Sequence, residues 1–212
     1  MVNSIEDMKK APPIVQEGTE EGAVLREIAP EVSVEMLGSK KLFAILADMS
    51  AALRLTSDGV AIAAPQIGVS LRIFVVRGYI MAGMHRKDEG ADDIPDVAFI
   101  NPIFLEASEE QKMHEGEGCL SCRGYSVHIE RPAQIKVRAQ DEHGEWREVD
   151  SVDNIHTDFL AEIFDHETDH LNGTLCIDHA QRVFKKIDGV WHLRGADGSW
   201  IAPKPKDETK EA

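Results

Sequence analysis

Two histidines four residues apart, His166 and His170, are the residues of this sequence best spaced to act on one chemical group together. A helix turns once in 3.6 residues, so both imidazoles lie on one face and can bind the same metal ion. Glu167 stands beside the first histidine and is a residue type that carries protons in metal hydrolases. An ordinary amphipathic helix with two hydrogen-bonded histidines is the alternative. The motif therefore needs a helix, a buried face and a third ligand.

The segment that carries these residues has the pattern of a buried helix. Residues 155–171 contain neither Pro nor Gly, and Asn172-Gly173 is typical of a helix end. Two adjacent rows at helical spacing run through the segment, one of Phe159, Ile163, His166 and His170 and the other of Leu160, Phe164, Glu167 and Leu171. A lone carboxylate on an apolar row is costly, so Glu167 needs a partner or a raised pKa. A metal ion with its water would provide both.

The third ligand is expected upstream of the helix. Asp178 and His179 follow the helix closely, but nothing distinguishes them. Glu117-Gly118-Cys119-Leu120-Ser121-Cys122 is a glycine-rich turn that presents two thiols. The thiolate of Cys119 with two imidazoles would make a tetrahedral site with one open position. An inert buried cysteine is the alternative, whereas a structural zinc site would need a second CxxC motif.

A third segment, residues 59–66, reads Gly-Val-Ala-Ile-Ala-Ala-Pro-Gln. Its small residues let a backbone approach another group closely, and Gln66 after Pro65 offers an amide donor. Taken alone, the segment is better explained as a tight connection between a helix and a strand.

In this order, the three segments resemble the motifs of the peptide deformylases, which are GφGφAAPQ, EGCLS and HExxH. They correspond to residues 59–66, 117–121 and 166–170, and the similarity extends from about Val24 to about Asp178. The resemblance implies an α+β fold in which antiparallel strands surround a central HExxH metal-binding helix, with a further helix near the N-terminus.

The resemblance also implies a reaction and a set of residue roles. The reaction is removal of the formyl group from N-formylmethionyl peptides or nascent polypeptides, with release of formate. The metal ligands would be Cys119, His166 and His170, holding one divalent ion, Fe²⁺ physiologically, with Zn²⁺, Ni²⁺ or Co²⁺ as substitutes. Glu167 would be the general base and acid, and Gln66 with the backbone N–H of Leu120 would form the oxyanion hole. Substrate-binding residues would be Val60, Ala61, Glu117, Gly118, Phe159, Glu162 and Ile163.

Four departures from the family pattern bear on this interpretation. Ala61 replaces a usual Gly, Asp165 a usual Gln, and Cys122-Arg123 an apolar residue followed by Pro. Glu162 stands where an apolar residue usually lies near the methionine pocket. Either its side chain leans into solvent or pairs with a basic neighbour, which is the favoured interpretation, or the pocket is less suited to methionine.

Three rival functions remain open. One is a metallopeptidase that uses the HExxH helix alone, and another is a divergent deformylase-like protein with altered specificity or without turnover. A cysteine hydrolase with Cys119 as the nucleophile is the weakest.

Length and pattern predict one catalytic domain with extensions. Among the 212 residues we expect a flexible leader over 1–23, the catalytic domain over 24–180, an extension over 181–202 with a β-hairpin around Asp188-Gly189, and a disordered tail over 203–212. Within the domain, the patterns predict a helix from Ser39 to about Leu55, strands over 71–76 and 97–105, a loop over 78–96, and a hairpin of 134–140 with 145–149. Pro102 in the second of these strands suggests a sheet edge or a bulge.

Composition restricts the partners. A net charge of −15 argues against general nucleic-acid binding, including direct DNA binding. No apolar run approaches the roughly 20 residues of a membrane helix, and three cysteines do not suggest a disulfide framework. We expect a cytoplasmic enzyme whose partners are the formylated peptide and, transiently, the ribosome.

Overall fold

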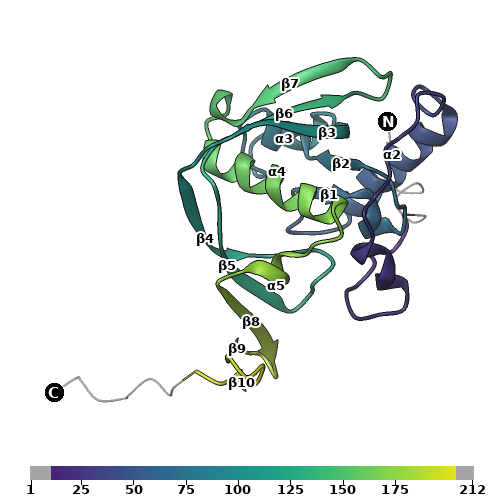
Figure 1. Ribbon diagram of the computed structural model, residues 1–212. Helices are drawn as coiled ribbons and strands as arrows, with labels where there is room; N and C mark the ends of the chain where they lie inside the picture. The colour runs from purple at the N-terminus through teal and green to yellow at the C-terminus, as the bar shows by residue number, and fades with distance from the viewer. Residues whose placement is uncertain (1–10, 204–212) are drawn as a thin grey trace.

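Two antiparallel sheets enclose one long helix (Figure 1). The computed structural model describes residues 11–203. The first sheet has the order β1 (Ala61–Ala63), β2 (Ile73–Val76), β3 (Val97–Ala107), β6 (Ile135–Gln140) and β7 (Trp146–Asp150). The second has the order β10 (Trp200–Ile201), β9 (Val190–Arg194), β8 (Arg182–Ile187), β5 (Tyr125–Pro132) and β4 (Gln111–Glu117). The helix between them is α4 (Thr157–Leu171), so the expected α+β architecture around the HExxH helix is confirmed.

Helix α4 is fixed by an aromatic core on the first sheet. Phe164 packs against Phe99 with ring centroids 5.2 Å apart, and Phe99 stacks on Phe74 at 4.7 Å. The helix ends where it was predicted to end, because Gly173 adopts a φ of 73°. A side chain at this glycine would also meet the carbonyl oxygen of Arg26 at 2.8 Å. The helix that carries the two histidines is therefore held at both its middle and its end.

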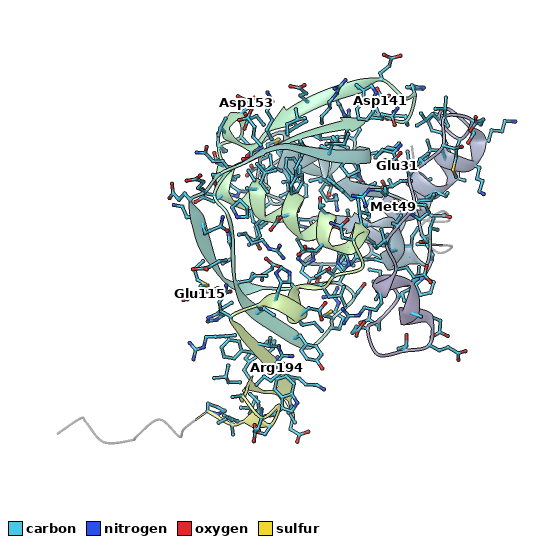
Figure 2. All side chains as sticks on the ribbon, in the orientation of Figure 1. Glu31, Met49, Glu115, Asp141, Asp153 and Arg194 are labelled. Carbon is cyan, nitrogen blue, oxygen red and sulfur yellow. The ribbon has the colours of Figure 1, made fainter. Side chains whose placement is uncertain are left out.

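The opposite face of the first sheet is covered by α2 (Lys40–Arg54). Ser39 caps this helix by accepting a hydrogen bond from the backbone N–H of Leu42 at 3.2 Å, as the sequence predicted. Met49 of this helix, labelled in Figure 2, is fully buried with Ile73 and Val75 of β2. Alternate residues of β2 thus face α2 and α4, which explains why the whole strand is apolar.

The N-terminal segment differs from the expected flexible leader. Val15 donates its backbone N–H to the carbonyl of Gln66 at 2.8 Å, and Glu17 donates to the carbonyl of Ser121 at 2.8 Å. The 3₁₀ helix η1 (Glu21–Arg26) follows and buries Leu25 completely. Residues 11–23 are therefore part of the packed domain, whereas residues 1–10 lie outside the described residues.

The segment predicted as a loop over 78–96 contains two short helices, α3 (Gly78–Met81) and the 3₁₀ helix η3 (Ala91–Asp93). At the end of this segment, the side chain of Asp96 is 5% exposed and forms ion pairs with Arg54 at 3.0 Å and Arg77 at 3.2 Å. Strand β3 has the expected bulge, where Asn101 adopts a φ of 50° and the register with β6 shifts. It lies inside the sheet, however, and not at an edge.

Two hairpins complete the frame. The pair β6 and β7 is the one predicted from the sequence, and β8 pairs with β9 around Asp188 and Gly189 as expected. Because β8 also pairs with β5, this C-terminal hairpin extends the second sheet instead of standing apart from it. The expected tail lies, from residue 204 onward, outside the described residues. The connections between the longer elements contain the short helices η2 (Ala64–Ile67), η4 (Ser151–Asp153) and α5 (Cys176–His179).

No helix within residues 11–203 is both long enough and apolar enough to cross a membrane.

Candidate active site

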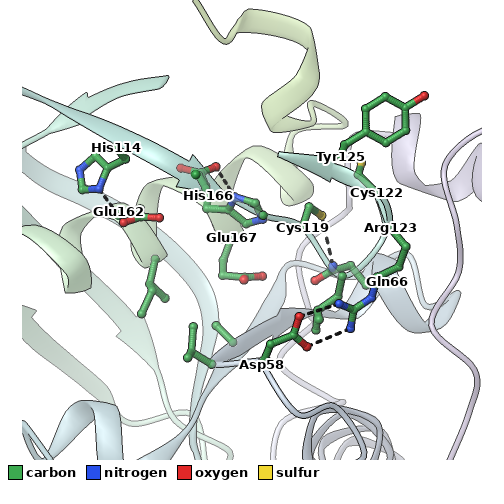
Figure 3. Close-up of a pocket in the computed structure, with 18 of the residues that line it drawn as sticks. Asp58, Gln66, His114, Cys119, Cys122, Arg123, Tyr125, Glu162, His166 and Glu167 are labelled. Carbon is green, nitrogen blue, oxygen red and sulfur yellow. Dashed lines mark hydrogen bonds and ion pairs between the residues drawn. The ribbon is translucent and has the colours of Figure 1, made fainter. Parts of the chain in front are cut away.

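A cavity of about 440 Å³ lies between α4, the start of β1 and the turn that joins β4 to β5. Figure 3 shows Cys119 and Gln66 on one side of His166 and Glu167, and Glu162 on the other. Every residue assigned a role from the sequence lines this cavity except His170, which is buried at 1% exposure. The lining residues among them are Val60, Ala61, Gln66, Glu117, Gly118, Cys119, Leu120, Phe159, Glu162, Ile163, His166 and Glu167.

Cys119, His166 and His170 bring their ligand atoms within 4.8 Å of one another. The sulfur of Cys119 lies 3.2 Å from Nε2 of His170, and the two imidazole rings lie 5.1 Å apart between centroids. Tetrahedral metal sites have bonds of about 2.0–2.3 Å to nitrogen and sulfur, which matches atoms grouped this closely. The donor set therefore fits a borderline-soft divalent ion such as Fe²⁺, Ni²⁺, Co²⁺ or Zn²⁺.

A second group of close donors consists of Glu117, His166 and Cys176. Two features disfavour it as the metal site. The carboxylate of Glu117 is already engaged by Arg131 and His166. In addition, Cys176 does not line the cavity, so one of the three donors lies away from the space that is open to a substrate. The group around Cys119 is the better centre.

The carboxylate of Glu117 orients the first histidine. Its Oε1 shares a hydrogen bond of 2.6 Å with Nδ1 of His166, and Arg131 donates two hydrogen bonds of 2.7 Å to the same carboxylate. A carboxylate behind a metal-binding histidine fixes the ring and its tautomer, which leaves the other nitrogen for the metal. Glu117 was expected to bind substrate; although it lines the cavity, its carboxylate is directed to His166 and Arg131 instead.

Arg131 is the centre of a buried ion network. Its side chain is 0% exposed, and besides Glu117 it bonds Asp165 at 2.8 Å and Asp169 at 3.0 Å. Asp169 also accepts a hydrogen bond from His179 at 2.9 Å, which extends the network to the end of α5. The departure at Asp165 is explained by the same contact, because an acid there meets the buried guanidinium.

Electrostatics of the network favour a charged Glu117 and a neutral His170. Burial alone would raise the pKa of Glu117, but hydrogen bonds from Arg131 and His166 lower it to about 2. Burial would lower the pKa of His166, yet the bond to Glu117 raises it to about 9. For His170, burial and the positive charge of His166 hold the pKa well below its usual value.

Glu167 has the properties of a proton carrier. It is 4% exposed, and its Oε2 has no hydrogen-bond partner within the described residues. Burial raises the pKa of Glu167 to about 7. A carboxyl group with such a pKa both accepts and releases protons near neutral pH.

Gln66 is held rigidly at the cavity wall. Its Oε1 accepts the backbone N–H of Ala63 at 2.8 Å, which fixes the orientation of the amide. Its Nε2 donates to Oγ of Ser121 at 3.2 Å and lies 3.7 Å from the sulfur of Cys119. A donor fixed beside a metal ligand can stabilise negative charge that develops on a carbonyl oxygen. Leu120 follows Cys119 directly and also lines the cavity.

Glu162 pairs with a basic neighbour. This is one of the two arrangements that the favoured interpretation of the departure at Glu162 predicted. Nδ1 of His114 lies 2.6 Å from its Oε2, and both side chains are largely buried at 13% and 15% exposure. The pair faces the cavity (Figure 3), so Glu162 does not lean into solvent.

Arg131 and His114 are the functional residues that sequence reasoning missed. For Arg131 the available signal was its place on the alternate row of Val127 and Ile129 in an extended segment. For His114 there was none, because its partner lies 48 positions away in a helix. Asp178 and His179, the other possible ligands, bond Arg26 and Asp169 and stay outside the metal group.

The comparisons decide the family. A model of the polypeptide deformylases matches residues 12–186 of this chain. The chain belongs to the polypeptide deformylase family. A peptide deformylase of Bartonella bacilliformis is 38% identical over 142 residues, which are 67% of this chain and 73% of the relative. A peptide deformylase of Fusobacterium nucleatum is 35% identical over 164 residues, 77% of this chain and 82% of the relative.

Solved structures agree with this family. A class I type b peptide deformylase from Acinetobacter baumannii, solved with Met-Ala-Ser bound, is 33% identical, with a TM-score of 0.65 over 80% of this chain and 98% of that chain. The same enzyme with actinonin bound is 32% identical, with a TM-score of 0.65 over 81% of this chain and 99% of that chain. This member of the deformylases is therefore a hydrolase that removes formyl groups from peptides, in a family whose chemistry depends on a metal.

Proposed function

We propose that Cys119, His166 and His170 hold one divalent ion and that Glu167, Gln66 and the backbone N–H of Leu120 perform deformylation beside it. The observation that carries the proposal is that these groups come from three separate segments of the chain and gather at one cavity, which all of them except His170 line. The substrate is an N-formylmethionyl peptide or nascent polypeptide, and the product besides the free amine is formate.

The metal fits the donor set, and Glu167 fits the proton chemistry. A divalent ion bound in such a site lowers the pKa of a coordinated water to about 7 and polarises a carbonyl. Glu167 accepts the proton that the attacking water loses as its oxygen adds to the formyl carbon. It then donates this proton to the amine nitrogen as the C–N bond breaks. The raised pKa of Glu167 suits both transfers.

Gln66 and Leu120 act on the formyl oxygen. Negative charge grows on this oxygen during the addition, and two fixed N–H donors stabilise it without having to reorient. The bond from Ala63 to Oε1 of Gln66 supports this role, because it aims the amide nitrogen away from β1 and toward Cys119. The walls at Val60, Ala61 and Gly118 are the surfaces against which the peptide backbone would lie.

We further propose Fe²⁺ as the physiological ion, with Zn²⁺, Ni²⁺ or Co²⁺ able to replace it, since a site of one sulfur and two nitrogens accepts each of them. Formylated chains arise from translation, so we place the enzyme in the cytoplasm with transient contact to the ribosome. The Acinetobacter relative has been solved with Met-Ala-Ser, the deformylated form of a formyl-Met-Ala-Ser substrate.

Substitution of single cysteines tests the ligand set. Cys119→Ala should lose both bound metal and formate release, whereas Cys176→Ala, which removes the thiol of the second donor group, should keep both. A metallopeptidase that used a different third ligand would keep its metal in Cys119→Ala. A cysteine hydrolase would keep activity after chelation of the metal, and a binding protein would release no formate at all. Metal content and formate release, measured on the same samples, separate these outcomes.

A further inference from the structure

A short segment near the N-terminus bonds to the backbone of both proposed oxyanion donors. On one side, the backbone N–H of Val15 donates to the carbonyl oxygen of Gln66 at 2.8 Å. On the other side, the backbone N–H of Glu17 donates to the carbonyl oxygen of Ser121 at 2.8 Å. Ser121 directly follows Leu120, whose backbone N–H is the second proposed donor. One stretch of chain thus connects η2 to the turn between β4 and β5.

Gln16, between these two residues, adds side-chain bonds to the same turn. Its Nε2 donates to the carbonyl oxygen of Leu120 at 3.1 Å, and its Oε1 accepts the backbone N–H of Arg123 at 3.4 Å. The first bond has an ordinary length and the second is long. Because both polar ends of the amide are engaged, the side chain of Gln16 bonds to the backbone of the turn at two positions three residues apart. One of these positions is the residue whose N–H must be aimed at the formyl oxygen.

Hydrogen bonds have to set the orientation of the peptide groups in this turn. The turn is flanked by Gly118 and Gly124, and a Cβ at either glycine would meet no atom within 4 Å. Glycine residues without such steric restraint have a wide choice of backbone angles. The ion pair of Arg123 with Asp58 is exposed and is therefore a weak constraint. The bonds from Gln16, in contrast, act on the backbone of the turn directly.

The segment that follows Gln16 holds it in place. Oγ1 of Thr19 donates to the carbonyl oxygen of Gln16 at 2.8 Å and accepts the backbone N–H of Gly22 in η1 at 3.1 Å. Helix η1 then buries Leu25 in the same hydrophobic cluster as Cys119. The amide of Gln16 therefore extends from a fixed backbone, so its bonds can hold the turn in one position relative to the packed domain.

We propose that Gln16 is a positioning residue for deformylation, which keeps the backbone N–H of Leu120 at a fixed place relative to the amide of Gln66. Gln16 does not line the cavity, so it acts through the turn and not on the substrate. Oxyanion donors are effective because they are oriented before the reaction, and a misplacement of about 1 Å can lower a rate about 100-fold. The inference rests on the proposed function and adds to it a residue outside the cavity.

Two substitutions remove the contacts of Gln16 in different ways. Gln16→Met keeps the length of the side chain without its polar atoms. Gln16→Glu keeps an acceptor for Arg123 but places a carboxylate oxygen opposite the carbonyl oxygen of Leu120. With formyl-Met-Ala-Ser as the substrate, each should lower kcat by about 10- to 100-fold. KM should stay within about twofold of the wild type, because the lost stabilisation belongs to the transition state.

Two further measurements distinguish positioning from general damage to the site. Metal content should equal that of the wild type, because Gln16 bonds to no proposed ligand side chain. The dissociation constant of the product Met-Ala-Ser, measured by calorimetry, should also stay the same, since the product has no formyl oxygen for the two donors to stabilise. Ser39→Ala is the control for a loss of stability alone. It removes the N-cap of α2, on the other face of the first sheet, and should lower Tm without changing kcat.

A kcat within about twofold of the wild type in Gln16→Met would overturn the positioning role and leave the deformylase function intact. Parallel changes in KM, metal content and product binding would also overturn it, because they indicate a disturbed site. If Gln16→Met does not fold, Gln16→Glu decides by the same criteria. Failure of the wild type itself to release formate would overturn the proposed function and this inference with it.

Discussion

Oε1 of Glu117 lies 2.6 Å from Nδ1 of His166, and the same carboxylate accepts hydrogen bonds from Nε and Nη2 of Arg131. This contact joins His166, a proposed metal ligand, to a buried guanidinium that reaches two further acids on the same helix. The ligand ring is therefore oriented by charges that belong to the core of the protein and not by solvent.

The first prediction concerns metal affinity. Glu117→Gln keeps the shape of the side chain but weakens its hold on His166, so the affinity for the divalent ion should fall by about 10- to 100-fold. Competition with a calibrated chelator measures this change. Glu130→Gln, at an exposed position of β5, is the control and should bind the ion as the wild type does. Equal affinities in all three proteins would remove the supporting role from Glu117.

The second prediction concerns stability. Arg131→Met leaves the buried carboxylate of Glu117 without its main partner, so the free energy of unfolding should fall by about 3–5 kcal/mol. Urea denaturation measures it. Arg138→Met on β6, where the side chain is exposed, should change the free energy by less than about 1 kcal/mol. Similar losses for both variants would contradict the importance of the buried network.

The third prediction separates rate from binding. Gln66→Met removes the amide donor at similar length, so kcat should fall by about 100- to 1000-fold, the usual cost of one oxyanion donor. KM and metal content should change little, because Gln66 is not a ligand. A kcat within a fewfold of the wild type would exclude Gln66 from the oxyanion hole.

The fourth prediction uses the pKa of Glu167 in the metal-free protein. Burial raises this pKa from 4.5 to about 7, so the folded state binds more protons than the unfolded state between these values. The stability that protonated Glu167 confers is therefore fully present below pH 4.5 and is lost as the pH rises through about 7. Relative to Glu167→Gln, the wild type should lose about 3 kcal/mol across this window. Thermal unfolding of both metal-free proteins at several pH values checks the difference, and parallel pH profiles would contradict it.

Local sequence patterns predicted many of the residues in the candidate site. The helix with His166 and His170 followed from the spacing of apolar residues and the Gly173 stop, and Cys119 followed from its glycine-rich turn together with the family resemblance. These features depend on residues close together in the sequence. Helix propensity therefore suffices to place the two histidines, whereas the choice of Cys119 as their partner needed the family resemblance as well.

Other features depend on contacts that no local pattern contains. The bond between Glu117 and Arg131 arises because β4 and β5 form a hairpin, and its register could not be deduced from the glycine-rich turn. Residues 11–23 resemble a loose leader in composition, but backbone bonds to Gln66 and Ser121 fix them against the site. Glu162 was recognised as a departure, whereas its partner His114 became evident only from the fold.

Formate release from formyl-Met-Ala-Ser is the most direct test of the central claim. The enzyme reconstituted with Fe²⁺ or Ni²⁺ under reducing conditions should release formate, and both chelation and Cys119→Ala should abolish the release. Formate release that persists in metal-depleted protein or in Cys119→Ala, or no release from the reconstituted wild type, would contradict a deformylase centred on Cys119, His166 and His170.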